Sequence, residues 1–386
     1  MRISARDRSR CRNQGSSQAA QADLWAGLQI DAACAVRQIE SFVRREVKRW
    51  GKRGVVIGLS GGLDSSTCAY LCVRALGAGR IYGLILPERD TDPQNVSHAR
   101  LVAQRLGIHI VDKDITPLLS ATGIYEPIPA EIAGSRHFLE SSIRWIARLT
   151  GHASTFSWAM GIYCNQHPGL LGRMIRRCFW GVAGSILAFA LTKPRVRMVM
   201  LYHAAAIHNA LVVGTTDRSE WTIGVYEAHG DGAADIALLI HLYKTQIREL
   251  ARYLGVPQEI INKPSSGDLA AGLPNESVIG LSYTQLDRVL YGLNYGIPEA
   301  EIMARARVTR RAIRDTQRAI AIANLRRSLP ARLPDVDEMG KAGCLAPAMG
   351  AAFPRQNRKS GHLVLAREDS YSKRKRHTAR PKNATV

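Results

Sequence analysis

The stretch GVVIGLSGGLDSSTCAYLCVRAL, residues 54–76, contains the boundary on which the fold depends. Its beginning, Gly54 to Ser60, is a short apolar run that ends in glycine and serine, which is typical of a strand buried on both faces of a parallel sheet. From Ser65 to Leu76 the composition favours a helix. The stretch therefore predicts a strand, a tight turn and a helix in direct succession.

The segments that follow repeat this alternation of strand and helix. A strand is expected at Ile81–Leu86, a helix at Gln94–Leu106 and a third strand at Ile108–Val111. This order is the pattern of a doubly wound α/β fold. We therefore predict an α/β protein with a doubly wound, mostly parallel sheet, flanking helices and a helical C-terminal segment.

The rest of the chain divides into regular and irregular parts. Residues 127–194 have no clear period and are interpreted as an insertion, a flap or a degraded segment. The other expected elements are helices at Ala26–Trp50, Arg197–Asn209, Tyr243–Leu254, Tyr283–Tyr291 and Pro298–Arg327, and a strand at Ala210–Gly214. We predict a disordered N-terminus (1–22), one catalytic domain (23–330) and a basic, disordered tail (331–386).

The chain of 386 residues is strongly basic, with a net charge of +21. Such a charge raises the question of a nucleic-acid partner. However, residues 354–386 hold ten Lys or Arg against two acids, and residues 1–50 hold ten against five, so much of the excess lies near the termini. Nucleic acid is therefore not the expected partner.

Cysteine usage and hydropathy indicate the compartment. The seven cysteines include no CxxC pair and no regular framework, so reduced thiols are expected, and Cys68 and Cys72 are interpreted as small buried side chains. The apolar run Phe179–Thr192 is shorter than the roughly 20 residues that span a bilayer. The first residues lack the apolar core of a secretory signal. We expect a cytoplasmic protein without a membrane partner.

The turn Gly58–Ser66 has the chemistry of a phosphate site. Backbone N–H groups at the start of a helix attract anions, and the glycines Gly61 and Gly62 let a phosphate approach closely. Ser60 and Ser65 add hydroxyl donors, and Asp64 supplies a carboxylate suited to Mg²⁺. No lysine follows the glycines and no GxGxxG is present, so neither common nucleotide motif applies. An ordinary strand-to-helix connection is the competing interpretation.

The motif SGGLDS resembles the pyrophosphate loop of the N-type ATP pyrophosphatases, which adenylate their substrates. Four further stretches, in order and spacing, make the chain similar to the NAD synthetase family of the ammonia-dependent type: 195–198 (RVRM), 212–220 (VVGTTDRSE), 230–235 (GDGAAD) and 242–250 (LYKTQIREL). The likeness covers about residues 55–122 and 195–330. It implies an adenine nucleotide alpha hydrolase-like fold.

The resemblance assigns residues to ATP and to a metal. Asp64 and Glu220 match the family's Mg²⁺ carboxylates, with a solvated surface acid as the alternative for Glu220. Lys244 matches an ATP contact, although without the family it would be interpreted as the exposed face of a helix. The full ATP-binding set that the resemblance implies is Gly58, Leu59, Ser60, Gly61, Gly62, Leu63, Asp64, Ser65, Thr215, Lys244 and Ser266.

The resemblance also assigns residues to the second substrate. Arg195 and Asp235 match positions that bind the deamidated dinucleotide, and Arg326 matches a third more loosely. Asp64 and Asp235 are the expected catalytic residues. Structural salt bridging is the competing account for Arg195 and Asp235. Ala228 stands where the family has a lysine, which removes a charge expected near the substrate.

The implied reaction is the ATP-dependent amidation of deamido-NAD to NAD through an acyl adenylate, with release of AMP and pyrophosphate. The enzyme would be a ligase forming a C–N bond, with ATP as co-substrate and Mg²⁺ as cofactor. Ammonia, free or from a separate glutaminase, would supply the nitrogen, and family likeness implies a homodimer. The alternatives are a related enzyme acting on another carboxylate or on tRNA, and a divergent, inactive ATP-binding homologue.

Overall fold

The computed structural model describes residues 25–126, 170–265, 275–327, 355–356 and 363–364. The chain divides into two compact units, residues 1–328 and 329–386, which are described separately. The expected disordered N-terminus and most of the expected tail lie outside the described residues. In the second unit, β6 (Arg355–Gln356) pairs antiparallel with β7 (Leu363–Val364).

The first unit is built on a five-stranded parallel sheet in the order β3-β2-β1-β4-β5. Its strands are β1 (Gly54–Gly58), β2 (Ile81–Ile85), β3 (His109–Asp112), β4 (Ala210–Gly214) and β5 (Ile236–Ala237). The central strand, β1, pairs with β2 in the register Val55–Ile81 and with β4 in the register Val55–Leu211. The order reverses between β1 and β4, and ligands of such sheets bind at the carboxyl ends of the strands there.

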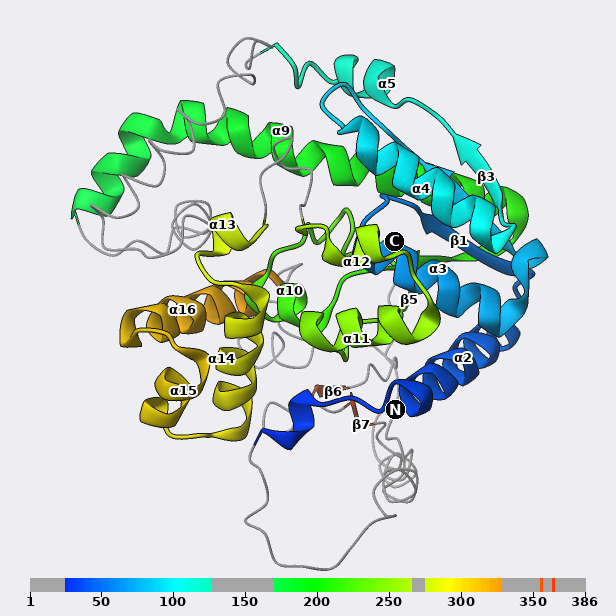
Figure 1. The fold of residues 1–386 in the computed structure, drawn as a ribbon. Helices are drawn as coiled ribbons and strands as arrows, with labels where there is room; N and C mark the ends of the chain where they lie inside the picture. Colours follow the sequence, from blue (N-terminus) through cyan, green and yellow to red (C-terminus); the bar gives the residue numbers. More distant parts are fainter. Residues whose placement is uncertain (1–24, 127–169, 266–274, 328–354, 357–362, 365–386) are drawn as a thin grey trace, which may run out of the picture. The chain divides into compact units, whose positions relative to one another are not determined.

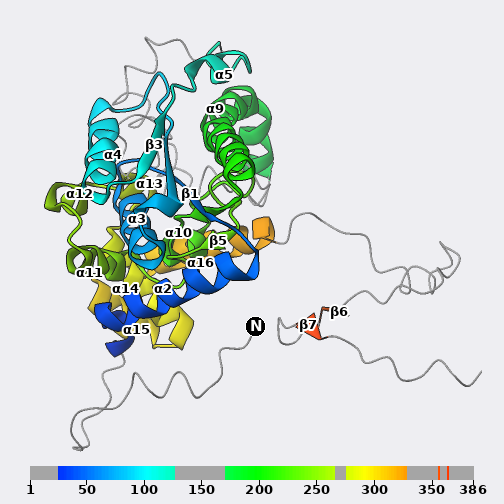
Figure 2. The ribbon, with the colours of Figure 1, turned by 90° about the vertical axis from the view of Figure 1, so that its right-hand side faces the viewer.

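Helices cover both faces of the sheet (Figure 2). Val55 and Ile57 of β1 pack against one group of helices, whereas Val56 faces the opposite side, as the two-residue period of a strand requires. The first group is α2 (Ala32–Arg49), α3 (Leu63–Leu76), α4 (Pro93–Leu106), α11 (Lys244–Leu254) and α12 (Gln258–Asn262). The other face is covered by α5 (Thr116–Ser120) and α9 (Leu170–His208). The predicted α/β architecture is therefore confirmed.

Helix α9 is longer than the sequence predicts. It spans Leu170–His208 and contains Pro194, whereas the predicted helix begins at Arg197. A proline usually ends or kinks a helix, and the apolar run Phe179–Thr192 hides any helical period. Residues 170–194, part of the segment without a clear period, are therefore helical, while 127–169 lie outside the described residues.

The C-terminal helices of the first unit pack around their own apolar core, which includes Trp25, Tyr283, Leu290 and Ile302. The helices are α10 (Arg218–Ile223), α13 (Asn275–Ile279), α14 (Tyr283–Tyr295), α15 (Glu299–Ala306) and α16 (Arg310–Arg327) (Figure 1). The helix predicted at Pro298–Arg327 is in fact two, because Arg307 adopts a left-handed backbone, φ 53°, and ends α15.

Two short helices, the cysteines and the lengths of the apolar helices are the remaining features of the fold. The 3-10 helices η1 (Ala26–Leu28) and η2 (Ala78–Arg80) flank regular elements. Cys68 and Cys72 are free and fully buried, as expected, but Cys34 is disulfide-bonded, so the expectation of reduced thiols is wrong at that position. Within the described residues, no helix combines the length and the apolar character needed to cross a bilayer.

Candidate active site

The turn between β1 and α3 is held in shape by its own glycines and hydroxyls. Gly61 has φ 71°, and a Cβ there would lie 2.0 Å from the carbonyl oxygen of Asn95, so no other residue fits. The N–H of Ser60 donates to Ser65 Oγ (3.2 Å), and the N–H of Gly62 donates to Ser60 Oγ (3.3 Å). The predicted ATP-binding stretch Gly58–Ser65 is therefore one preformed turn at a helix N-terminus, where anions bind.

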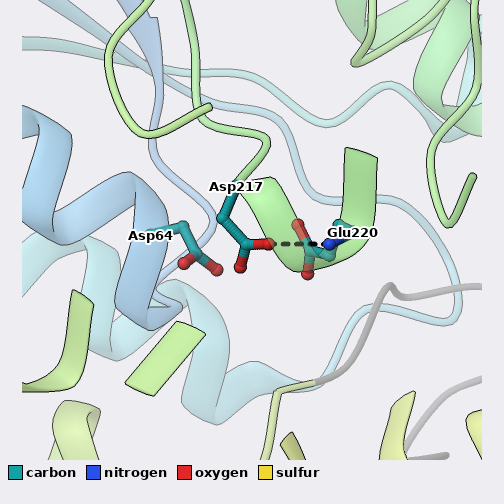
Figure 3. Close-up of side chains that lie close together, drawn as sticks. All are labelled: Asp64, Asp217 and Glu220. Atoms are coloured by element: carbon teal, nitrogen blue, oxygen red, sulfur yellow. Dashed lines mark hydrogen bonds between the residues drawn. The ribbon is translucent and has the colours of Figure 1, made fainter. Parts of the chain in front are cut away.

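Three carboxylates meet beside this turn (Figure 3). Asp64 lies in the first turn of α3, Asp217 is the N-cap of α10, and Glu220 lies in the first turn of α10. One ligand oxygen from each lies within 4.8 Å of the others. Asp217 Oδ1 also accepts a hydrogen bond from the N–H of Glu220 (2.7 Å), which fixes their relative position. We call Asp64, Asp217 and Glu220 the acidic cluster.

Lys244, the first residue of α11, inserts its ammonium group into the acidic cluster. Its Nζ lies 2.8 Å from Asp64 Oδ2, 2.7 Å from Asp217 Oδ2 and 2.9 Å from Glu220 Oε1. The side chain is 0% exposed, so the exposed helix face considered from the sequence is wrong. Glu220, whose side chain is 14% exposed, is likewise not a solvated surface acid.

The electrostatics of the acidic cluster are unbalanced. Burial, reinforced by the charge of Asp217, raises the pKa of Glu220 to about 8. Burial also raises the pKa of Asp217 to about 6, although the neighbouring Lys244 opposes this shift. For Lys244, burial would lower the pKa, but the carboxylates outweigh it and the pKa is raised. One ammonium against three carboxylates leaves uncompensated negative charge.

The same residues fit a divalent cation. Asp64 Oδ1 and Asp217 Oδ2 are buried and have no hydrogen-bond partner among the described residues. Asp217 Oδ2 does lie at ion-pair distance from Lys244, but without the geometry of a hydrogen bond. Mg²⁺ prefers hard carboxylate oxygens and shares them with nucleotide phosphates. Asp64, Asp217 and Glu220 are thus the residues that could hold a metal.

Helix α14 supports this arrangement through hydrogen bonds to α10 and α11. Asp287, which is buried, accepts hydrogen bonds from Ser219 Oγ (2.5 Å) and from the N–H of Thr245 (2.8 Å). The N–H of Lys244 donates to Ser219 Oγ (3.1 Å), and the hydroxyl of Tyr283 donates to Glu220 Oε1 (3.2 Å). One element therefore fixes the start of α11 relative to α10.

Three residues of the site, Asp217, Tyr283 and Asp287, were not predicted from the sequence. Asp217 could have been found as an acidic N-cap directly after a strand, three residues before Glu220. The other two lie on a helix more than sixty residues away, and nothing in their local sequence marks them as neighbours of the cluster. Of the remaining ATP residues predicted, Thr215 follows β4 directly, and Ser266 lies outside the described residues.

The predicted substrate residues Arg195 and Arg326 meet at a carboxylate that the sequence did not indicate, Glu227. Arg195 Nη2 lies 2.7 Å from Glu227 Oε1, and Arg326 Nη2 lies 3.5 Å from Glu227 Oε2. Arg326 is buried and also donates to the carbonyl oxygens of Gly224 and Tyr226. Arg195 thus forms a salt bridge with Glu227, which is the competing interpretation stated for this residue.

Asp235 is held at the edge of the sheet. Its Oδ2 accepts a hydrogen bond from the N–H of Val212 (2.7 Å), and its Oδ1 accepts one from the hydroxyl of Tyr202 on α9 (3.3 Å). The residue is exposed, immediately before β5. These contacts are hydrogen bonds rather than the salt bridge that was considered as an alternative.

A parallel sheet with a glycine-serine turn and an acidic cluster at its switch point defines the class of a nucleotide-binding α/β enzyme. Comparison with known proteins specifies the family. The model of the family described as NAD synthase matches residues 35–136 and 183–330. The chain belongs to the NAD synthase family, as its sequence motifs predicted.

Individual relatives agree with this assignment. The NH(3)-dependent NAD(+) synthetase of Methanocaldococcus jannaschii is 36% identical over 255 residues, which cover 66% of this chain and 79% of the relative. The enzyme of the same name from Rhizobium meliloti is 34% identical over 284 residues, covering 71% and 83%.

Solved structures support the fold. An NMN synthetase from Francisella tularensis matches with a TM-score of 0.57 and 24% identity, covering 80% of this chain and all of the other. An NH3-dependent NAD synthetase from Campylobacter jejuni matches with a TM-score of 0.54 and 22% identity, covering 79% and 100%.

Proposed function

We propose that this protein is an ammonia-dependent NAD synthetase, which uses ATP to convert the carboxylate of deamido-NAD into the amide of NAD. The observation that carries the proposal is the acidic cluster beside the glycine-serine turn, where a metal-bound nucleotide fits. Relatives that are 36% and 34% identical are named for this activity.

The turn Gly58–Ser65 would bind the β and γ phosphates of ATP. Its backbone N–H groups and its serine hydroxyls are donors, and the N-terminus of α3 carries partial positive charge. Thr215 and Ser266 are proposed as further ATP contacts, and Lys244 as the cation that orders the acidic cluster next to the phosphates. The turn is preformed, so little reorganisation accompanies binding.

Asp64, Asp217 and Glu220 would hold Mg²⁺. The bound ion would neutralise phosphate charge and so make pyrophosphate a better leaving group. The buried oxygens of Asp64 and Asp217 that have no hydrogen-bond partner within the described residues support this role. Burial and the charge of Asp217 together raise the pKa of Glu220, so this carboxylate would be stabilised in its charged form by a nearby cation.

The first chemical step is adenylation. A carboxylate oxygen of deamido-NAD forms a bond to the α-phosphorus, and the bond from that phosphorus to the α–β bridging oxygen breaks. The electron pair leaves with pyrophosphate. Donors fixed in the turn stabilise that developing charge, so the chain contributes electrostatics and position rather than a covalent intermediate of its own.

The second step forms the amide. The nitrogen of ammonia bonds to the carbonyl carbon of the acyl adenylate, the carbon–oxygen bond to AMP breaks, and a proton leaves the nitrogen. Asp235 is proposed to position the nicotinate side of the substrate, where a carboxylate can accept hydrogen bonds from sugar hydroxyls. Exclusion of water protects the adenylate from hydrolysis.

Arg195 and Arg326 are proposed to bind the dinucleotide. The side chain of Arg195 is 42% exposed and its guanidinium is oriented by Glu227, so its remaining N–H groups can reach a phosphate or carboxylate. The buried Arg326 shapes this region through the carbonyl oxygens of Gly224 and Tyr226. Arg195 would also contribute positive charge in a region where Ala228 replaces the lysine of the family.

The working unit is proposed to be a cytoplasmic homodimer supplied with free ammonia or with ammonia from a separate glutaminase. Helix α9 presents apolar side chains to solvent, since Val199 and Ile207 are each 66% exposed. A second copy of the chain is the proposed cover for this face. Light scattering during gel filtration should give twice the mass of the chain, and a monomer at assay concentrations would refute the dimer.

The activity is tested with ATP, Mg²⁺, ammonium and deamido-NAD. We expect AMP and NAD in equal amounts. ATP turnover that requires tRNA would instead support the alternative suggested by the net charge of +21. Absence of turnover under both conditions would contradict the proposed function and favour an inactive homologue.

A further inference from the structure

The phosphate turn carries no lysine of its own. Leu63 and Asp64 follow Gly62. In a P-loop, a lysine and then a serine or threonine follow the last glycine. Lys244, assigned to ATP by family likeness, is 0% exposed and lies within 2.9 Å of three carboxylates. Its charge is therefore already engaged by the acidic cluster. Apart from the proposed Mg²⁺, a cation that pairs with the departing pyrophosphate would therefore have to come from another residue.

Lys263 is placed to be that cation. It follows α12 directly, is only partly buried, and donates a hydrogen bond from Nζ to Asn95 Oδ1. Asn95 lies in the first turn of α4, and its carbonyl oxygen is the atom that packs against Gly61. The lysine is thus bonded to the residue that forms the wall of the phosphate turn.

The positive charge of Lys263 is not balanced locally. Within the described residues no carboxylate lies at ion-pair distance from its Nζ, and the side chain that accepts its hydrogen bond, Asn95, is a neutral amide. The charge of Lys263 also affects the nearby imidazole of His98. Burial lowers the pKa of His98, and the charge of Lys263 lowers it further. An ammonium held by an amide can exchange that contact for a phosphate oxygen at small cost.

We propose that Lys263 is a phosphate-binding residue of the ATP site, which moves from Asn95 to the β and γ phosphates and stays with pyrophosphate as it leaves. The proposal rests on the proposed function and adds to it the cation that the turn lacks. When the bond between the α-phosphorus and the bridging oxygen breaks, the electron pair goes to pyrophosphate, and the ammonium of Lys263 stabilises that charge.

The experiment uses the full chain and compares Lys263→Gln with Lys263→Arg. Calorimetry with Mg²⁺ measures the affinity for ATP and for inorganic pyrophosphate. Because charge-assisted hydrogen bonds are strong, Lys263→Gln should weaken both affinities by about tenfold or more, and Lys263→Arg should restore most of the loss. The affinity for deamido-NAD should stay unchanged.

Lys52 offers a matched control. Its Nζ donates to Asn209 Oδ1 (3.1 Å), so Lys52→Gln also removes a bond between a lysine and an asparagine. Lys52 precedes β1, at the opposite end of that strand from the phosphate turn. Lys52→Gln should leave both affinities unchanged.

A second measurement needs no variant. Acetylation of the wild-type protein, read by mass spectrometry, should be slowed at Lys263 by pyrophosphate and Mg²⁺, but not at Lys52. Two results would overturn the proposal: unchanged acetylation at Lys263, or full ATP affinity in Lys263→Gln accompanied only by a lower melting temperature. Either would show that Lys263 only links α12 to α4 structurally. If the wild type binds neither ATP nor pyrophosphate, the proposed function falls together with this inference.

Discussion

Asp217 performs two tasks with its two oxygens. Oδ1 caps α10 by accepting the N–H of Glu220, and Oδ2 lies 2.7 Å from the ammonium of Lys244. The first task needs only an acceptor, whereas the second needs charge. The residue therefore links the local start of a helix to the electrostatics of the acidic cluster.

This division predicts the behaviour of Asp217→Asn. Asparagine caps helices about as well as aspartate, so the melting temperature should change by only a few degrees. Loss of one carboxylate should raise the Mg²⁺ concentration for half-maximal activity by about tenfold or more, the size of effect seen when groups that support a metal are lost. Asp92→Asn is the control, because Asp92 caps α4, which contributes no residue to the cluster. Equal effects of the two variants would contradict the assignment.

His98 makes the stability of the fold sensitive to acid. Burial, and then the charge of Lys263, lower its pKa below 6.5, and Nδ1 is buried with no partner among the described residues. The unfolded chain therefore binds a proton more readily than the folded one, so stability falls as the pH drops below about 6.5. His98→Leu should reduce the loss of melting temperature between about pH 7 and 5. An unchanged pH profile would refute this prediction; His109→Leu, at an exposed position, is the control.

At the scale of elements, α10, α11 and α14 meet at one buried side chain. Asp287 accepts hydrogen bonds from Ser219 Oγ and from the N–H of Thr245. Lys244 directly precedes Thr245, so these bonds also fix the position of Lys244. Helix α14 thus sets how far Lys244 stands from Glu220. Its influence on the site is positional, since the hydrogen bonds of Asp287 end on α10 and α11.

Asp287→Ala should therefore damage both stability and the metal site. It leaves the N–H of Thr245 and the hydroxyl of Ser219 without their buried acceptor, which costs about 2–4 kcal/mol in the free energy of unfolding. Asp287→Asn keeps one acceptor and should lie between wild type and alanine. Urea denaturation measures the first effect and the Mg²⁺ dependence of activity the second. A variant that loses stability but keeps its Mg²⁺ dependence would deny Asp287 a positioning role.

The helices and strands that could be predicted from the sequence are those whose signals are local. β1, β2, β4, α4 and α11 were predicted within a few residues, because their apolar pattern and their glycine and proline boundaries are local. β5 was missed because it is only two residues long, and the part of α9 before Arg197 was missed because Pro194 lies inside the helix. Asp64 was predicted from its own turn, but Tyr283 and Asp287 join the site only through tertiary packing.

For the whole molecule, the distribution of charge and the division into units both separate the basic tail from the part of the chain that carries the site. The first compact unit ends at residue 328, and the family match ends at residue 330. The basic residues concentrated in 354–386 therefore lie beyond the part of the chain that carries the site. The high net charge is largely a property of the ends of the chain rather than of the sheet and its cluster.

A truncated protein, residues 1–330, should keep the kcat and the KM for ATP of the full chain within about twofold. Both can be measured in the assay with ATP, Mg²⁺, ammonium and deamido-NAD, with thermal denaturation to check the fold. A loss of activity with an intact fold would show that the tail contributes to catalysis, and the predicted domain boundary would be wrong.

In the proposed reaction, a carboxylate oxygen attacks the α-phosphorus of ATP at the turn after β1. The most direct test uses deamido-NAD labelled with ¹⁸O in its carboxylate, together with ATP, Mg²⁺ and ammonium, and analyses the products by mass spectrometry. One ¹⁸O atom is expected in the phosphate of AMP and none in pyrophosphate. Label in inorganic phosphate with formation of ADP, or unlabelled AMP formed together with NAD, would contradict it.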